Sequence, residues 1–496
     1  MPAHFGLTLR LCDAGNRHDA VILEPPPAID LARLFEPRGI AVLGASPDVA
    51  KIRGRIFAAL RSGGYGGQLV PVNPSHREVQ GLPAVARVAD LPRGIDLAVI
   101  AIPATQVAEA LVECADAGVR AAVVLSSGFA EIGAAGIALQ AEIERVARAR
   151  GIALLGPNSV GFLNMAAGIK ATFSPGGLAA PARVIQRARR ITIASQSGGI
   201  GFALYNRGIA RGLLFNLVVT TGNEAGVSVL DALDHALGLS DTGAIVMFIE
   251  GLRDAVRLGA LAARAAERRV PLIAAKIGRS AAATRAVLSH TGSDTGIEIA
   301  YAALFEAVGV LRGEDQDDLL DLAAAFATCP LPAGERVGIV TITGGGGAWL
   351  ADRLVAEGLA VPELDGATQK AIHAVIPPYG TAANPVDITA QALEVGGRIR
   401  AIEALLKSPA VDAIAVVASL ADVGHLEKER AALAGFAANG VKPIVFYSYT
   451  VPAPDNLAVL DDAGIACYTT LGGVARGLAG LVRFGARRDR QLREAR

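Results

Sequence analysis

The feature that most constrains the fold of this chain is a recurring pattern of short segments. Short apolar runs are each followed by a turn of small residues and then by a helical pattern. Such runs are typical of buried strands, and their alternation with helices indicates βαβ units. Parallel strands are covered on both faces, so we predict an α/β chain of doubly wound domains. The expected strands are 39–43, 68–72, 97–102, 121–125, 153–155, 191–194, 217–220, 244–249, 271–275, 336–341, 413–417, 443–446 and 466–468.

Two stretches that contain Pro and Gly divide these strands into three groups. A chain of 496 residues is long enough for about three domains. We expect an N-terminal extension over 1–30 and domains over 31–175, 181–328 and 335–490. Only the alternation of strands and helices recurs, not a sequence repeat.

Composition excludes several classes of protein. Lys plus Arg and Asp plus Glu number 47 each, so no overall field favours nucleic acid or an anionic membrane. No apolar stretch has the length and flanks of a membrane span, and the start of the chain lacks a signal-peptide pattern. The four cysteines are far apart and form no metal-ligand set. We expect reduced thiols in a cytoplasmic protein and no metal site in this chain.

One histidine stands in a segment of small residues. We predict a loop from Lys276 to Gly296, after the strand 271–275, and it carries His290 between Ser289 and Thr291. Imidazole is a good nucleophile toward phosphorus near neutral pH, because much of it is uncharged there. Small neighbours would let the ring move and a phosphoryl group approach. A solvated or helix-capping histidine is the competing interpretation.

A second small-residue turn follows the strand 191–194 and opens a helix. Free amides at a helix start attract anions, and serine hydroxyls add donors. A purely structural turn is the alternative. Two acids, Glu224 and Glu250, are expected at the same edge of this sheet, where a carboxylate would orient an imidazole, although either might instead cap a helix. The turn residues are Ser195, Gln196, Ser197, Gly198 and Gly199.

The first group of strands has its own turns at the carboxyl ends, where open α/β sheets bind ligands. One of these turns feeds a helix start, which suits a nucleotide phosphate. NAD fits poorly, because there is no GxGxxG and no acidic residue after the strand 68–72. Singly, each turn is better explained as a helix cap or a tight turn. The candidate residues are Gly44, Ala45, Ser46, Lys51, Asn73, Pro103, Ser126 and Asn158.

Together these motifs, above all Ser289-His290-Thr291-Gly292, resemble the ADP-forming (NDP-forming) acyl-CoA synthetases, relatives of succinyl-CoA synthetase. The resemblance covers about residues 31 to 480. It implies a Rossmann-like CoA-binding domain followed by two flavodoxin-like domains. It also implies that His290 is phosphorylated, that Glu224 orients it with Glu250 as second choice, and that the turn 195–199 holds the phosphate. The eight candidate residues of the first group of strands would line the CoA groove, with Lys51 a candidate to hold the CoA phosphates. The family often has Cys where this chain has Ser159.

The reaction implied by the resemblance is acyl-CoA + ADP + phosphate ⇌ carboxylic acid + ATP + CoA, through an acyl phosphate. The sequence shows no ATP-grasp domain. We therefore expect an α-type subunit in a hetero-oligomer or homodimer, with ADP or ATP and Mg²⁺ on a separate ATP-grasp β-type subunit. A non-catalytic CoA-binding or acyl-CoA-binding protein is the alternative. The glycine turn 344–347 lacks the ending of a Walker A motif, and we assign it no catalytic role.

Overall fold

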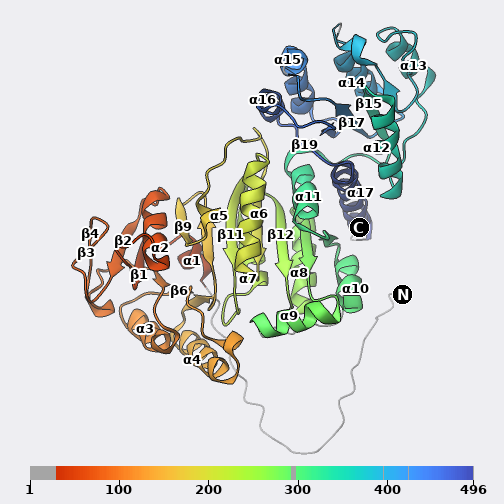
Figure 1. The fold of residues 1–496 in the computed structure, drawn as a ribbon. Coiled ribbons are helices and arrows are strands. Elements are labelled where there is room, and N and C mark those ends of the chain that lie inside the picture. Colours follow the sequence, from red (N-terminus) through yellow and green to blue (C-terminus); the bar gives the residue numbers. More distant parts are fainter. Residues whose placement is uncertain (1–29, 292–297, 395, 423, 495–496) are drawn as a thin grey trace, which may run out of the picture.

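The computed structural model describes residues 30–291, 298–394, 396–422 and 424–494. They form three α/β domains, each built on one largely parallel sheet (Figure 1). The predicted fold class is confirmed. In all three sheets the parallel strands follow the spatial order 2-1-3-4-5 by their sequence within the domain, which is the flavodoxin-like variant of the doubly wound fold.

The first sheet is entirely parallel. Its strands, in spatial order, are β2 (Gln68–Val72), β1 (Gly39–Leu43), β5 (Leu97–Ile100), β6 (Ala121–Val124) and β7 (Ala153–Leu155). The helices are α1 (Leu31–Phe35), α2 (Ile52–Ser62), α3 (Ala104–Asp116) and α4 (Ala134–Arg150). A small hairpin replaces a helix between β2 and β5. The remaining pieces are β3 (Glu78–Val79), β4 (Leu82–Pro83), and the short turns η1 (Val88–Asp90) and η2 (Ala130–Ile132).

The second sheet has seven strands and carries an antiparallel edge. In spatial order the strands are β14 (Leu311–Arg312), β13 (Leu272–Lys276), β12 (Thr242–Ile249), β10 (Arg190–Ser195), β11 (Phe215–Thr220), β8 (Gly161–Asn164) and β9 (Ile169–Thr172). The helices are α5 (Pro175–Leu178), α6 (Gly198–Ala210), α7 (Val229–Gly238), α8 (Ala255–Glu267), α9 (Ala281–Thr291), α10 (Glu298–Val308) and α11 (Gln316–Thr328). Helices α7 and α8 cover one face of the sheet, and α6 and α11 cover the other.

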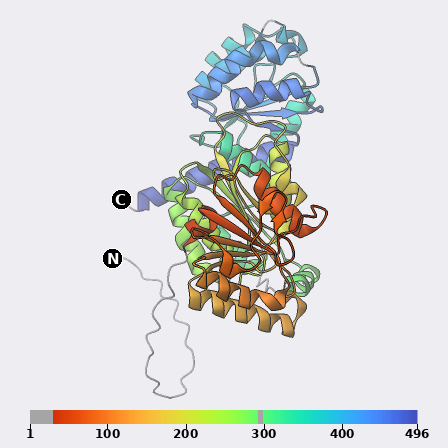
Figure 2. The same ribbon diagram turned by 90° about the vertical axis from the view of Figure 1, so that its left-hand side faces the viewer.

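The third sheet is again parallel. Its strands are β16 (Val386–Asp387), β15 (Val337–Thr341), β17 (Ala413–Ala418), β18 (Ile444–Ser448) and β19 (Cys467–Tyr468). Its helices are α12 (Gly344–Ala356), α13 (Gly366–His373), η3 (Ala390–Leu393), α14 (Gly397–Lys407), α15 (Gly424–Asn439), α16 (Pro454–Ala463) and α17 (Leu471–Glu494). This domain lies beyond one end of the second domain, whereas the first domain packs on its side (Figures 1 and 2).

Two differences from the sequence prediction concern the second domain. Strands β8 and β9 lie in the range assigned to the first domain, yet they extend the second sheet, because β8 pairs with β11 and β9 pairs with β8. The segment predicted as a loop around His290 instead contains the helix α9. Ser280 caps this helix, because its Oγ accepts the N–H of Ala283 at 3.1 Å, and the Ala-rich stretch that follows has high helix propensity. The other limits of the domains stay a prediction.

Apolar cores continue across the domain boundaries. One core joins the first domain to the face of the second sheet under α7 and α8, and another joins the opposite face to the third domain. Helix α17 belongs to the latter core, and its Phe484 ring meets that of Phe326 edge to face with centroids 5.5 Å apart. The three domains are therefore packed as one body.

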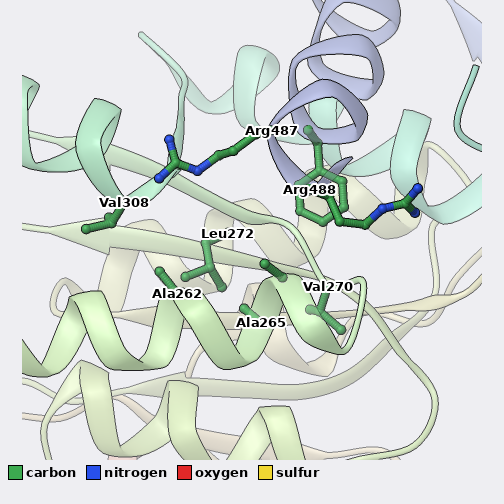
Figure 3. A pocket seen from close by; sticks show the side chains of 10 residues that line it. Ala262, Ala265, Val270, Leu272, Val308, Arg487 and Arg488 are labelled. Atoms are coloured by element: carbon green, nitrogen blue, oxygen red, sulfur yellow. The ribbon is translucent and has the colours of Figure 1, made fainter. Parts of the chain in front are cut away.

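The far end of α17 lies over the second domain (Figure 3). Arg487 donates to the carbonyl of Glu306 at 2.9 Å and to that of Ala307, at the carboxyl end of α10. The crevice between Arg487 and Val308 has a volume of about 10 Å³, which is room for about one water molecule. We interpret this region as a packing seam in which a guanidinium satisfies helix-end carbonyls.

Among the described residues, no helix is both long enough and apolar enough to cross a lipid bilayer.

A cluster of charges ties α17 to the second domain. Asp321 of α11 lies 2.9 Å from Arg211 and 3.7 Å from Arg476. Burial nevertheless raises the pKa of Asp321 to about 6, because the lost hydration outweighs both arginines. Its neighbour Asp317 is more exposed. Burial favours a higher pKa for Asp317, but the hydrogen bond from Arg207 and the nearby arginines hold this pKa below the usual range.

These opposite shifts predict different pH dependences for two matched variants. Because the pKa of Asp321 is raised, its protonated carboxyl group contributes stability that is fully present below the unfolded pKa. This stability is lost as pH rises toward about 6. Asp321→Asn should therefore gain stability relative to wild type between pH 5 and pH 7.5, by on the order of 2 kcal/mol. The difference between Asp317→Asn and wild type should stay nearly constant over the same range, because a carboxyl with a lowered pKa is ionised in both the folded and the unfolded state there. Urea unfolding at the two pH values measures both, and a relative loss for Asp321→Asn would contradict the assignment.

Candidate CoA and phosphoryl-transfer site

A cleft opens at the carboxyl edge of the first sheet, between β1 and β5, where the strand order reverses. Its volume is about 510 Å³, within the range of pockets for metabolites and cofactors. Five of the predicted CoA residues line it, namely Gly44, Ser46, Lys51, Asn73 and Pro103. Three basic residues that we did not predict also line it, Arg53, His76 and Arg87. The cleft therefore brings several cations to a site expected to hold a phosphorylated ligand.

The turn after β1 depends on two close backbone approaches. Gly44 has φ +81°, and a Cβ there would lie 2.8 Å from the carbonyl oxygen of Ala101. A Cβ on Gly54 would lie 1.9 Å from the carbonyl oxygen of Asp48. Helix α2 therefore starts close to β1, with Lys51 at its N-cap and without a side-chain cap. Its first amides are positioned to receive an anion.

Some predicted CoA residues shape the cleft without lining it. Ala45 is fully buried. The Oγ of Ser126 donates to the carbonyl of Ile102 at 2.5 Å. Asn158 has φ +56° and its Nδ2 donates to Oδ1 of Asn223 at 3.3 Å. These side chains hold the loops in place. The same is true of Ser159, whose buried Oγ donates to the carbonyl of Thr220 at 2.6 Å.

The predicted phosphate turn lies between β10 and α6. Ser197 is the N-cap of α6 and makes no side-chain cap, so the first amides of the helix have no side-chain acceptor there. Gly198 is required by packing, because a Cβ would lie 2.1 Å from a methyl carbon of Val160. The Oγ of Ser195 donates to the carbonyl of Ser197 at 2.6 Å. The expected donor at Ser195 is thus turned toward the backbone, and the amides remain as the predicted anion-binding groups.

Gln196 is the central residue of this region. Its Nε2 donates to the carboxylate of Glu224 at 3.0 Å and to the carbonyl of Gly251 at 2.7 Å. Its Oε1 accepts the N–H of Glu250 at 2.6 Å and that of Gly251 at 3.1 Å. One buried amide side chain therefore fixes the loops after β10, β11 and β12 relative to one another.

Glu224 is buried and its carboxylate is fully engaged. Oε1 accepts from Thr221 Oγ1 at 2.9 Å and from the N–H of Val229 at 2.7 Å, while Oε2 accepts from Gln196. Burial raises the pKa of Glu224, although these donors and Arg253 oppose the rise. The hydrogen bond from the N–H of Val229 caps α7. The geometry of Glu224 therefore fits a helix cap better than it fits a carboxylate that points toward an imidazole.

Glu250 is the second choice for the predicted orienting role. It is buried and directly follows β12, whose neighbour β13 ends at Lys276, where the chain turns toward α9. Its backbone is held by Gln196. Which of the two glutamates orients His290 stays a prediction.

Helix α9 ends with His290 in its last turn. The His290 side chain and the segment 292–297 lie outside the described part of the structure. The helix itself contacts the turn η2 of the first domain, and it lies at the end of the second domain away from the third (Figures 1 and 2). The helix that carries His290 is thus in contact with the first domain, which also contains the CoA cleft.

The loop between β11 and α7 joins the two domains directly. Ala225 N–H donates to the carbonyl of Gly156 at 2.9 Å, and Val227 N–H to that of Leu154 at 2.7 Å. The Nδ2 of Asn223 donates to Glu131 Oε2 at 2.7 Å. Glu131 in turn accepts the N–H of Gly128 at 2.6 Å. A rigid connection therefore runs from a loop of the CoA cleft to Glu224.

The fold and these loops define a CoA-binding doubly wound protein with a second domain suited to phosphoryl groups. Comparison with protein families agrees. The CoA binding domain family matches residues 38–165. The succinyl-CoA ligase like flavodoxin domain matches residues 188–326, and the Ligase-CoA domain matches residues 337–417.

Three known proteins place the chain more closely. The α subunit of acetate–CoA ligase (ADP-forming) II of Pyrococcus furiosus is 35% identical over 396 residues, which are 79% of this chain and 84% of that protein. Acetate–CoA ligase (ADP-forming) of Methanocaldococcus jannaschii is 32% identical over 73% of this chain but only 50% of that protein. Acetyl-coenzyme A synthetase 1 of Ca. Korarchaeum cryptofilum, solved with phosphate and ADP, has a TM-score of 0.84 and 31% identity, covering 94% of this chain and 99% of that chain.

The chain belongs to the ADP-forming acyl-CoA synthetase family and has the domain set of its α subunit. The resemblance inferred from the sequence motifs is confirmed. The members of this family are acid–CoA ligases, and this chain is an enzyme of that class.

The role of Gln196 as the link between three loops can be tested by stability. Gln196→Ala leaves the buried N–H groups of Glu250 and Gly251 without their acceptor. We expect the free energy of unfolding to fall by about 2–4 kcal/mol, since a buried unsatisfied group costs about 1–3 kcal/mol. Urea unfolding measures this. Gln68→Ala, at the exposed start of β2, is the matched control, and equal stabilities of the two variants would refute the role.

Proposed function

We propose that this chain supplies the CoA-binding and phosphohistidine half of an ADP-forming acyl-CoA synthetase. The overall reaction would interconvert acyl-CoA, ADP and phosphate with a carboxylic acid, ATP and CoA. The observation that carries the proposal is the contact between α9, which ends with His290, and turn η2 of the CoA-binding domain. A histidine at that place is next to the domain where the thioester would react.

The first step would take place at the CoA cleft. Lys51, Arg53 and Arg87 line the cleft and would hold the phosphates of CoA by charge-assisted hydrogen bonds. An oxygen of inorganic phosphate attacks the thioester carbonyl, the C–S bond breaks, and the departing sulfur takes a proton from the phosphate. The products are an acyl phosphate and CoA thiol.

The second step would move phosphorus to the protein. A ring nitrogen of His290 attacks the phosphorus of the acyl phosphate, the bond between phosphorus and the acyl oxygen breaks, and the carboxylate leaves. Uncapped amides at the start of α6 would stabilise the phosphoryl charge. A buried carboxylate stabilises an imidazolium, and we assign this role to Glu250 with Glu224 as its scaffold.

The third step would need a second subunit. Since the Pyrococcus furiosus relative is an α subunit, we propose that an ATP-grasp β-type chain holds ADP or ATP with Mg²⁺ and receives the phosphoryl group from His290. An oxygen of the ADP β-phosphate attacks phosphorus and the P–N bond breaks.

Cys114, Cys329 and Cys467 are free thiols, which suits our proposal that the protein works in a reducing compartment such as the cytoplasm.

The phosphohistidine can be tested by labelling. With a β-type partner and ATP carrying labelled γ-phosphate, the wild-type chain should become labelled, and His290→Ala should show no label because the nucleophile is lost. His373→Ala is the control, since His373 is exposed at the end of α13. Label on His290→Ala at the wild-type level would refute the proposal. A wild-type chain that binds CoA yet takes no label would instead favour a CoA-binding protein without catalysis.

The CoA cleft can be tested without a partner. Lys51→Ala should weaken CoA binding about tenfold, because one charge-assisted contact to a phosphate is worth about 1–2 kcal/mol. Titration calorimetry with CoA measures the change. Arg77→Ala, an exposed residue just outside the cleft, should bind like wild type. Equal losses in the two variants would point to a general charge effect and against this cleft.

A further inference from the structure

The third domain contains a cavity at the place where doubly wound sheets bind ligands. It lies at the carboxyl ends of β15 and β17, where the strand order reverses, and its volume is about 370 Å³. Ile342 follows β15 into its wall and Ser419 follows β17. The cavity is separate from the CoA cleft and from the start of α6, and none of the three proposed steps uses it.

A buried arginine faces this cavity. The Arg398 side chain, in the first turn of α14, is only 3% exposed and lines the cavity wall. Its Nε donates to Glu429 Oε2 at 2.7 Å. Within the described part of the chain, its two Nη groups make no hydrogen bond. A guanidinium held by its Nε presents its remaining N–H groups as a planar fork, which matches a carboxylate or phosphate.

The local backbone brings Arg398 to this wall. The turn η3 packs against the start of α14, where a Cβ on Gly397 would lie 2.6 Å from that of Ala392. The chain enters η3 through Thr389, which has φ +59° and ψ 162°, a conformation that side-chain-bearing residues rarely adopt. The Thr389 Oγ1 is buried without a hydrogen-bond partner. Strain of this kind persists where the surrounding structure imposes it, and ligand sites are common among such places.

The rest of the wall indicates the ligand's other groups. Helix α12 begins at Gly344, two residues after Ile342, and its N-cap Thr343 makes no side-chain cap, so its positive end adds to the field for an anion. At the mouth, the carboxylate of Glu394 is an exposed acceptor that suits a hydroxyl group.

We propose that the third domain binds a small hydroxylated organic anion, with its carboxylate or phosphate on the Nη groups of Arg398 and a hydroxyl group toward Glu394. Such a site would let the enzyme respond to a metabolite that takes no part in the CoA chemistry.

The test uses the full chain and three probes of matched size. D-Glycerate and glycerol 3-phosphate carry the two anionic groups on similar hydroxylated frames, and glycerol carries none. In titration calorimetry we expect one of the anions, at up to about 10 mM, to bind with a dissociation constant of about 1 mM or tighter. Hydrogen exchange should slow in residues 389–398 and 419–422. Neutral glycerol should not bind.

Variants assign the binding to Arg398. The double variant Arg398→Met/Glu429→Met removes the pair together, because replacing a buried ion pair by apolar side chains often preserves the fold. It should bind the anion at least about tenfold more weakly, whereas Arg353→Met, an exposed arginine of α12 outside the cavity, should bind like wild type.

A milder variant covers the case in which the double variant does not fold. Gln391→Glu changes only an exposed wall residue and adds a negative charge, so it should weaken the anion severalfold. The proposal fails if neither anion binds, if glycerol binds as well as the anions, or if protection appears outside the third domain. It also fails if the affinity of each folded variant equals that of wild type.

Discussion

The pairing of the loop after β11 with the end of β7 is the interaction on which the arrangement of this protein depends. Backbone bonds from Ala225 and Val227 to Gly156 and Leu154 fix the first domain against the second. A Cβ on Gly222 would lie 2.3 Å from the carbonyl oxygen of Pro157, so the two backbones could not approach as they do with a larger residue there. Glu224 lies in this same loop, and the CoA cleft and the phosphoryl region are therefore built on one shared seam.

The buried polar groups near this seam are satisfied by one another. Gln196 uses both ends of its amide, and Glu224 accepts from three donors. A carboxylate in such a place has a raised pKa because it has lost water, even though its hydrogen bonds favour the charged form. A network in which every buried polar group has a hydrogen-bond partner is stiff, because breaking any one bond leaves a buried group unpaired. Stiffness here would keep the phosphoryl region in register with α9.

The same topology is used three times for different purposes. Each sheet has the order 2-1-3-4-5 and therefore a crevice at its reversal point. In the first domain that crevice is wide and lined by cations. In the second it meets the uncapped start of α6. In the third it contains a buried guanidinium. Helix α17 returns from the third domain across the second and buries Phe484 against Phe326, so a ligand in the third domain would act on an element packed against both domains.

Much of this structure follows from local sequence. The apolar runs predicted the parallel strands to within about two residues in most cases, because buried strands need continuous apolar side chains. The small-residue turns predicted where helices would start with uncapped amides, as α2 and α6 do. The motif around His290 was enough to indicate the family. By contrast, the short strands β8 and β9 were missed, since four-residue segments carry little pattern, and α9 was mistaken for a loop because its small residues also suit loops.

What the sequence determined by itself was the kind of elements, their order and the residues that meet the solvent at strand ends, because these depend on neighbours along the chain. Only the tertiary structure decided that Glu224 caps α7, that Ser195 turns to the backbone, that Arg53, His76 and Arg87 join Lys51, and that Arg398 faces a cavity. Each of these depends on which distant groups supply hydrogen bonds and on how much water is excluded, and neither is encoded in the spacing of residues.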